Sequence, residues 1–192
     1  TFQEESTLDQ QLYFNEHYFS PSQWMSFRAQ MEGVRLLKPQ TVLEIGIGNG
    51  FVSSLLKKCG YSVTTMDINP GLEPDYVGSI TELGKVFPNQ SFDVVLCAEV
   101  MEHLPFDLFP TCIKNIAEVS RVGAVITLPN AKRQIINIYG HIPKININIF
   151  WGLGVKNIPP EHHWEVDSTK QTKLCNITRT MGSYFTLQDI QR

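Results

Sequence analysis

The segment TVLEIGIGNGF, residues 41–51, restricts what this chain can fold into more than any other segment. Its first five residues are apolar or β-branched apart from Glu44, and they predict a buried strand. Gly46, Gly48 and Gly50 follow where that strand must turn sharply into a helix. Glycine permits positive φ and lets a ligand approach the backbone, where the first amides of the helix point outward. The pattern therefore favours a ligand site, with a tight turn that binds nothing as the alternative.

Strands and helices are predicted to alternate over most of the chain. Residues 22–37 carry apolar side chains at spacings of three and four, the period of an amphipathic helix. The continuous apolar run 94–98 predicts a strand that is buried on both faces. The expected strands are 41–45, 62–66, 76–78, 91–100, 124–128 and 184–190, and the expected helices are 22–37, 51–59, 107–119 and 168–181. This alternation predicts a parallel α/β sheet with right-handed crossovers.

Residues 129–160 interrupt the alternation with a long connection rich in Asn, Ile, Pro and Gly. Connections of this length in compact domains are usually lids or binding loops. Tyr139, His141, Phe150 and Trp151 are candidates for covering a flat or apolar ligand. The alternative is an ordinary packed insert, since aromatic side chains are commonly part of a core.

Length and composition limit the kinds of protein that this chain can be. Its 192 residues, 42% of them hydrophobic, are enough for one well-buried domain and few for two. A net charge of −3 and dispersed basic residues predict no DNA partner, although they are compatible with an RNA substrate. The sequence has no apolar run of roughly 18 residues and no export signal, and its four cysteines are widely spaced. We therefore expect a cytoplasmic protein with no membrane span and reduced thiols.

Two carboxylates accompany the glycines and narrow the choice of ligand. Asp67 ends the next strand, about twenty residues on, where an acidic side chain can accept both hydroxyls of a ribose. Glu44 lies two residues before the first glycine. The dinucleotide fingerprint requires a glycine at its sixth position, which Phe51 occupies here, so a nicotinamide oxidoreductase is disfavoured. Together these residues predict a site for a nucleoside with a cationic appendage.

Five ordered segments carry a family resemblance. They are VLEIGIGNG (42–50), TTMDINP (64–70), VGSI (77–80), SFDVVLCAEVMEHL (91–104) and GAVITLPN (123–130). In this order they resemble class I S-adenosylmethionine-dependent methyltransferases of the type 11/12-like group. The resemblance implies an α/β, Rossmann-like doubly wound fold, with a mostly parallel sheet of about six to seven strands flanked by helices. Because the C-terminal region offers one evident strand, that edge of the sheet is expected to be truncated relative to the family.

The same resemblance implies one methyltransferase domain over residues 1–192. Its parts would be an N-terminal helical cap (1–40), the cofactor-binding core (41–130), an acceptor-recognition insert or lid (131–160) and a C-terminal helix and strand (161–192). S-adenosylmethionine is the implied cofactor, with S-adenosylhomocysteine as its product.

Cofactor-binding residues follow from the resemblance at the ends of the strands. They are Glu44, Gly46, Ile47, Gly48 and Gly50 for the methionine part, Asp67 for the ribose, Ile68, Ser79 and Ile80 for adenine, and Ala98 and Glu99 beside the sulfonium. The family often has aspartate at the position of Ser79, where it binds the adenine amino group. We expect the adenine contact in this chain either to pass to the backbone or to be weaker.

Candidate catalytic residues lie in the segments EVMEH (99–103) and EHHWEV (161–166). A hydroxyl acceptor benefits from a base or a metal that removes its proton. One helical turn would place Glu99 on the same face as Glu102 and His103, with His162 or His163 as a further ligand, a spacing similar to that of metal-dependent O-methyltransferases. Metal-free relatives also carry Glu-His-Leu after this strand. We therefore assign His103 and His162 as catalytic residues and assign no metal.

The function predicted from the sequence is methyl transfer from S-adenosylmethionine to a small-molecule acceptor, with oxygen as the favoured atom. One alternative is a binding or scaffold protein that keeps the fold and has lost activity. A lesser alternative is a metal-dependent O-methyltransferase that acts on RNA or on a quinone-type ring.

Overall fold

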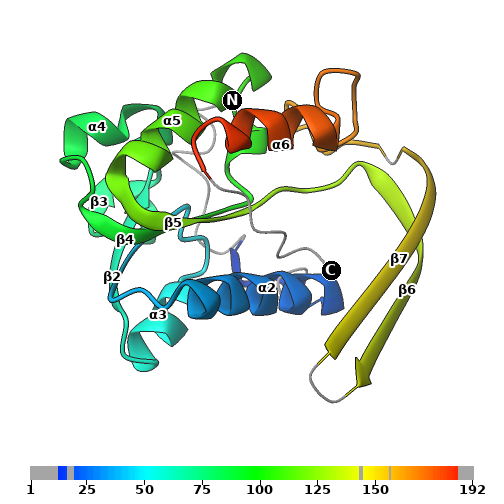
Figure 1. The fold of residues 1–192 in the computed structure, drawn as a ribbon, viewed down its shortest axis with the longest axis horizontal. Coiled ribbons are helices and arrows are strands. Elements are labelled where there is room, and N and C mark those ends of the chain that lie inside the picture. The colour runs from blue at the N-terminus through cyan, green and yellow to red at the C-terminus, as the bar shows by residue number, and fades with distance from the viewer. Residues whose placement is uncertain (1–12, 17–19, 143–144, 156, 186–192) are drawn as a thin grey trace.

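A computed structural model of the protein describes residues 13–16, 20–142, 145–155 and 157–185 (Figure 1). Its centre is a parallel sheet with the order β3-β2-β1-β4-β5 among the described residues. The strands are β1 (Thr41–Ile45), β2 (Ser62–Asp67), β3 (Tyr76–Val77), β4 (Phe92–Ala98) and β5 (Ser120–Thr127). Because the order reverses between β1 and β4, the carboxyl ends of these two strands border a crevice that is open to ligands. The predicted doubly wound, parallel α/β fold is confirmed.

Helices cover both faces of this sheet (Figure 1). One face carries α2 (Pro21–Leu37) and α3 (Phe51–Lys58), and on the other side lie α4 (Leu83–Val86), α5 (Phe109–Val119) and α6 (Leu174–Gly182). Short 3₁₀ turns complete the connections: η3 (Pro70–Leu72), η4 (Ile80–Glu82), η5 (Met101–His103) and η6 (Phe106–Leu108). The predicted helices 22–37, 51–59 and 107–119 are found within two residues of their expected ends.

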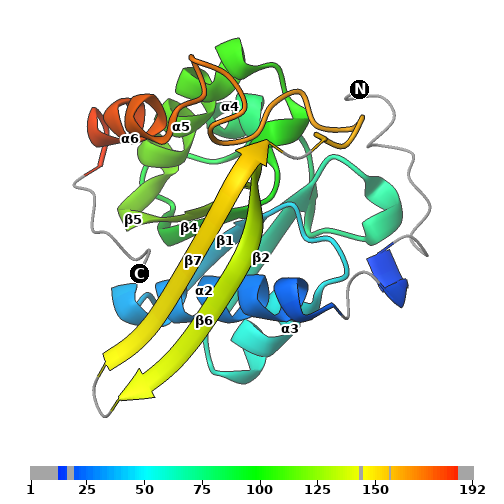
Figure 2. The same ribbon diagram turned by 90° about the vertical axis from the view of Figure 1, so that its right-hand side faces the viewer.

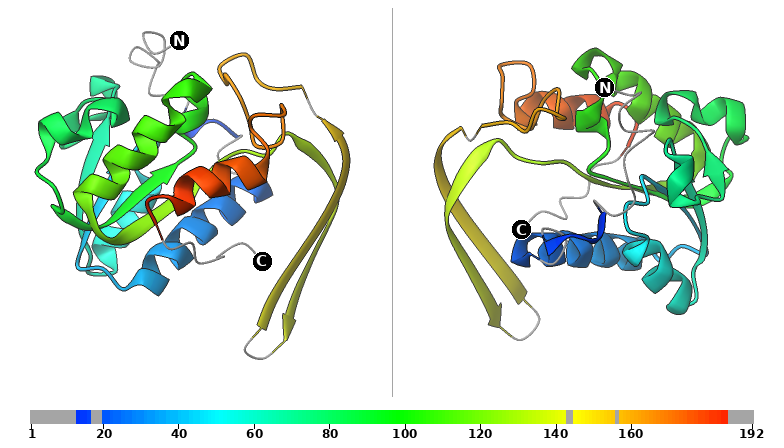
Figure 3. Two further views of the ribbon diagram at one scale, coloured as in Figure 1. Left: turned by 45° about the horizontal axis from the view of Figure 1, so that its top comes forward. Right: turned by 180° about the vertical axis from the view of Figure 1, so that it is seen from behind.

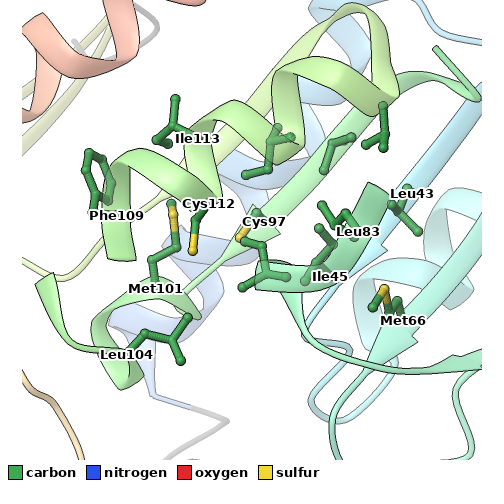
Figure 4. Close-up of a cluster of buried hydrophobic side chains, with 14 of the residues drawn as sticks. Leu43, Ile45, Met66, Leu83, Cys97, Met101, Leu104, Phe109, Cys112 and Ile113 are labelled. Carbon is green, nitrogen blue, oxygen red and sulfur yellow. The ribbon is translucent and has the colours of Figure 1, made fainter. Parts of the chain in front are cut away.

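Strand β1 is buried on both faces, which explains why its residues Val42, Leu43 and Ile45 are apolar. Val42 belongs to the core cluster under α2 and α3, together with Val34 and Leu56. Leu43 and Ile45 belong to the cluster on the opposite face, which α5 and the turn after β4 complete (Figure 4). The two clusters hold β1 in the centre of the molecule, so the loop that follows it starts from a fixed point.

Residues 132–155 form an antiparallel hairpin instead of the irregular connection expected from the sequence. Strand β6 (Lys132–Ile142) pairs with β7 (Ile145–Val155) in a two-stranded sheet of its own. The alternating ININIF sequence at the start of β7 has the period of a strand and is rich in β-branched isoleucine, which explains the difference. The hairpin extends away from the central sheet (Figures 2 and 3). The side chains of Tyr139, His141, Phe150 and Trp151 lie outside the described part of the structure.

The last predicted helix begins later than expected, at Leu174 instead of Ser168. Ser168 Oγ donates to the carbonyl of Glu165 at 2.7 Å, and Thr169 N donates to Thr172 Oγ1 at 2.9 Å. Such hydroxyl bonds offer the backbone an alternative to helical hydrogen bonds, so the helix starts only after them. The strand expected at 184–190 is not confirmed at its start, since Tyr184 and Phe185 follow α6 in a turn. Residues 186–190 lie outside the described residues.

No helix in the described part of the chain is both long and apolar enough to cross a lipid bilayer.

Candidate active site

The glycine loop after β1 uses the conformational freedom that the sequence suggested. Gly46, Gly48 and Gly50 have φ angles of 78°, 51° and 70°, in the left-handed region that other residues rarely adopt. A Cβ atom on Gly46 would collide with Val100 Cγ2, so this position also lacks space for a side chain. Gly50 is the N-cap of α3, without a side chain of its own to cap it. The loop therefore brings bare backbone to the carboxyl end of β1.

Asp67 holds this loop and lies at the end of β2. Its Oδ2 accepts a hydrogen bond from Ile47 N at 2.9 Å, and its Oδ1 accepts one from Asn69 N at 2.8 Å. Asn69 in turn accepts from Gly71 N at 2.9 Å, which caps the turn η3. One carboxylate thus connects the ends of two neighbouring strands.

A pocket of about 510 Å³, part of it open to solvent, lies where these strands end. Its lining residues are Ile45, Gly46, Asp67, Ile68, Gly78, Ser79, Ile80, Glu99, Val100, His103 and Leu104. Seven residues expected from the sequence are among them: Gly46, Asp67, Ile68, Ser79, Ile80, Glu99 and His103. The predicted residues Glu44, Ile47, Gly48, Gly50, Ala98 and His162 lie outside this lining.

The part of the pocket formed by Ile68, Ser79 and Ile80 is largely apolar. The Ser79 hydroxyl accepts from Thr81 N at 3.2 Å and lies 2.8 Å from Thr81 Oγ1, so it caps the turn η4. Asn115 Nδ2 donates to the carbonyl of Ile80 at 3.0 Å and fixes the same turn from α5. The serine hydroxyl therefore has a local structural role at the position where a longer acid would reach into the pocket.

Glu44 lies behind the pocket, next to the lining residues Ile45 and Gly46, and is 4% exposed. Burial raises the pKa of its carboxyl to about 8, and a hydrogen bond with Ser53 opposes this shift. The side chain is therefore mostly protonated at neutral pH. A cationic group that bound beside it would favour the ionised form.

Glu99 ends β4 in a conformation that non-glycine residues seldom adopt, with a φ of 53°. Its Oε1 accepts from Thr127 Oγ1 at 2.9 Å, and its backbone N donates to the Thr127 carbonyl at 3.1 Å. This left-handed turn separates Glu99 from the 3₁₀ turn that begins at Met101. The expected shared helical face of Glu99 with Glu102 and His103 is therefore absent, and Glu99 is held against β5.

His103 and His162, which are far apart in the sequence, meet beside the pocket. Their rings form an edge-to-face pair, with centroids 5.0 Å apart and an interplanar angle of 87°. Glu102, His103 and His162 each offer one ligand atom within 4.8 Å of the others. These three groups have the donor types and spacing of a divalent metal site. The structure thus brings the two predicted catalytic histidines together, with Glu102 rather than Glu99 beside them.

Four hydrogen bonds hold the segment 162–166, which carries His162, between two parts of the fold. His163 N donates to the Glu102 carbonyl at 2.8 Å, and Trp164 Nε1 donates to the Leu104 carbonyl at 3.0 Å. On the other side, Val166 exchanges two backbone bonds with residues 129–131 at the end of β5. Trp164 is 2% exposed and packs edge-to-face on two phenylalanines of the α5 region. His162 is consequently fixed next to the pocket by residues close to it in sequence.

His162 has a carboxylate partner that the sequence did not single out. Its Nδ1 lies 3.0 Å from Glu165 Oε1, and Glu165 is completely buried. Burial lowers the pKa of His162, and the hydrogen bond to Glu165 opposes this shift. In the sequence, only the spacing of three residues between His162 and Glu165 hinted at this pair. That spacing becomes informative only once the segment is known to lie beside His103. The lining residues Ile45, Val100 and Leu104 were also missed, because their apolar side chains suggested core, and so was Gly78.

A family described as a methyltransferase domain matches residues 14–192. The chain belongs to this methyltransferase family. The resemblance noted in the sequence and the class I methyltransferase fold are both confirmed.

Curated relatives of this methyltransferase include two bacterial proteins named ubiquinone biosynthesis O-methyltransferase. The protein from Xanthomonas euvesicatoria pv. vesicatoria is 32% identical over 126 residues, which are 58% of this chain and 48% of the relative. The protein from Paramagnetospirillum magneticum is 36% identical over 78 residues, which are 34% of this chain and 30% of the relative. The chain thus spans about half the length of the first of these relatives, and less of the second.

Solved structures support the fold of the methyltransferase at low sequence identity. A SAM-dependent methyltransferase from Archaeoglobus fulgidus has a TM-score of 0.52 and 19% identity, covering 65% of this chain and 61% of that one. The N-methyltransferase NodS from Bradyrhizobium japonicum, solved with S-adenosyl-L-homocysteine, has a TM-score of 0.52 and 14% identity, covering 72% of this chain and 87% of that one.

Proposed function

We propose that this methyltransferase transfers a methyl group from S-adenosylmethionine to a hydroxyl of a small-molecule acceptor. The observation that carries the proposal is the composition of one pocket, in which Gly46 and Asp67 lie with Glu99 and His103. The first two suit a nucleoside and its amino-acid part, and His103 is a group that can act on an acceptor. A single pocket thus offers both halves of the reaction.

The cofactor half fits the residues that are present. Asp67 lines the pocket with a carboxylate, a group that can accept hydrogen bonds from ribose hydroxyls, and Ile68 and Ile80 offer apolar surfaces for adenine. The positive φ angles of the glycines leave bare backbone for the methionine part, with the buried Glu44 carboxyl close to the loop. When bound, S-adenosylmethionine supplies an activated methyl group on a sulfonium. The protein has to hold it in a dry pocket at attack distance from the acceptor.

The acceptor half depends on the paired histidines. His103 is one of the residues that line the pocket, and the His162 ring contacts the His103 ring edge-to-face. An imidazole at this place can orient a hydroxyl and accept its proton as the oxygen attacks the methyl carbon. The O-methyltransferase names of the curated relatives support an oxygen acceptor.

The proposal is tested by incubating the protein with isotope-labelled S-adenosylmethionine and a metabolite extract, followed by mass spectrometry. We expect a labelled product that differs from its precursor by one methyl group and whose label resists conditions that cleave methyl esters. Binding of S-adenosylhomocysteine without turnover on any acceptor would favour a scaffold. Failure to bind this compound in calorimetry would contradict the cofactor assignment itself.

A second candidate is metal-assisted O-methylation of a quinone-type ring or an RNA end, favoured by the convergence of Glu102, His103 and His162. A divalent ion at these groups would lower the pKa of an acceptor hydroxyl without a base. Dialysis against a chelator distinguishes the candidates. Loss of turnover that added Mg²⁺ or Zn²⁺ restores would support the metal, and unchanged turnover would support the histidines alone.

A further inference from the structure

We propose that Glu165 is a positioning residue. Its buried carboxylate accepts a hydrogen bond from Nδ1–H of His162 and so leaves the lone pair on Nε2, the nitrogen that can act as the base when the acceptor is methylated. The inference rests on the proposed function, in which His162 takes part in the reaction. It goes beyond that function because it assigns a role to a residue that does not line the pocket.

The geometry of Glu165 is that of a fixed acceptor. The residue is completely buried, and its Oε1 lies 3.0 Å from His162 Nδ1. Its backbone is locked by Ser168, whose Oγ accepts from Glu165 N at 3.2 Å and donates to the Glu165 carbonyl at 2.7 Å. A carboxylate is costly to bury, because it loses its hydration. Burying the Glu165 carboxylate beside a histidine whose ring contacts the pocket residue His103 is better explained by a role at the site than by stability alone.

His162 is held from two further directions. Its backbone N donates to the Pro159 carbonyl at 3.0 Å, and its ring packs edge-to-face on His103. Its side chain is 15% exposed, so little room remains for the ring to turn. The hydrogen bond at Nδ1 is therefore the contact that can select one orientation and one tautomer of this ring.

The chemical consequence follows from the two ring nitrogens. In a neutral imidazole one nitrogen carries the proton and the other has the lone pair. A carboxylate beside Nδ1 accepts a hydrogen bond from Nδ1–H and thereby stabilises the tautomer with a lone pair on Nε2. Without Glu165 both tautomers would be populated, and the productive nitrogen would be available only part of the time.

Three variants of the full chain separate positioning from a purely structural role. Glu165→Ala removes the acceptor. Glu165→Gln keeps the size of the side chain but offers an amide NH2 that can donate to Nδ1 and so favour the other tautomer. Glu161→Gln is the matched control, because Glu161 is an exposed carboxylate one residue from His162. Thermal unfolding of each variant shows whether it is folded.

The first measurement is the tautomer of His162, read from ¹⁵N chemical shifts of histidine-labelled protein, with His162→Gln used to assign the signal. We expect a protonated Nδ1 in the wild type and in Glu161→Gln, a mixture of tautomers in Glu165→Ala, and a larger share of protonated Nε2 in Glu165→Gln. A protonated Nε2 in the wild type, or an unchanged tautomer in Glu165→Ala, would overturn the proposal. This arm needs no acceptor, and the wild-type result stands even if Glu165→Ala does not fold.

The second measurement is steady-state turnover with the acceptor found in the labelling experiment. Glu165→Ala should lower kcat by roughly 10- to 100-fold, the usual effect of removing a partner that orients a histidine. The affinity for S-adenosylhomocysteine should stay unchanged, and Glu165→Gln should lower kcat at least as much as Glu165→Ala, because its amide can hold the unproductive tautomer. A wild-type kcat in either folded variant would contradict positioning through Nδ1. Absence of turnover in the wild type would instead count against the proposed function and leave the tautomer result to decide.

Discussion

Asp67 serves two purposes at the scale of a single residue. Its carboxylate accepts amide protons from Ile47 and Asn69, and it also lines the pocket. Hydrogen bonds to a charged group are typically worth more than neutral ones. Removing the carboxylate should therefore make the glycine loop less well held and lower the affinity for a ribose.

Replacing Asp67 with alanine should weaken S-adenosylhomocysteine binding by about 2 kcal/mol, roughly 30-fold. Isothermal titration calorimetry measures this loss, with Asp67→Asn as the control that keeps one acceptor oxygen. Unchanged affinity in Asp67→Ala would mean that the ribose is held elsewhere.

Glu44 should make the ligand-free protein less stable as the pH rises. Its pKa is about 8 in the folded protein against an ordinary value of 4.5, so the folded state binds a proton that the unfolded chain has released. This contribution to stability is complete below pH 4.5 and is lost as the pH rises to about 8. Glu44→Gln should abolish it, so urea titrations should show the variant gaining on the wild type across this window. A constant difference between the two proteins would show that Glu44 is ionised in the fold.

At the scale of elements, the amino ends of three strands are joined by one carboxylate at the edge opposite the pocket. Asp93 Oδ2 accepts from Gln40 N at 2.8 Å and from Thr41 N at 3.0 Å, next to the start of β1. Its Oδ1 lies 2.9 Å from Arg121 of β5. These contacts connect β1, β4 and β5 far from any ligand.

Asp93→Asn should lower the melting temperature at pH 7, with a difference that disappears in acid. Hydrogen bonds from the Thr41 and Gln40 amides, with a smaller contribution from Arg121, lower the pKa of Asp93 to about 2. The stabilisation is therefore present above the ordinary pKa of 3.8 and is lost as the pH falls towards 2. Differential scanning fluorimetry between pH 2 and 7 measures it. Glu32→Gln, which breaks an exposed pair with Arg35, is the control and should change little.

The strands of the central sheet were predictable because each is a run of apolar or β-branched residues between turn residues, and local sequence decides such runs. The prediction that the last helix starts at Ser168 was wrong, since the hydroxyls of residues 168–172 form hydrogen bonds with the nearby backbone and with one another. The left-handed turn at Glu99 could not be read from the sequence, because contacts with β5 stabilise it. The pairing of His162 with His103 depends in the same way on hydrogen bonds between distant segments.

At the scale of the whole molecule, the chain consists of a wound α/β body and a hairpin that pairs mainly with itself (Figure 3). The pocket residues all belong to the body. The body should therefore bind the cofactor without the hairpin, and we propose acceptor recognition as the role of the hairpin.

Replacing residues 135–155 with a short Gly-Ser linker should leave S-adenosylhomocysteine affinity unchanged within about twofold and abolish turnover. Circular dichroism controls for folding, and calorimetry and the labelled-methyl assay supply the two readouts. Loss of cofactor affinity in a folded deletion variant would contradict a separate role for the hairpin.

The short segment 162–166 ties the histidine pair to the end of β5 and to the turn after β4 through its own backbone bonds. Nothing in that attachment involves the glycine loop or Asp67. Substitutions in this stretch can alter which molecules are methylated while the way the methyl donor is held stays as it was. A single small domain can in this way acquire new substrates without changes in the glycine loop or at Asp67.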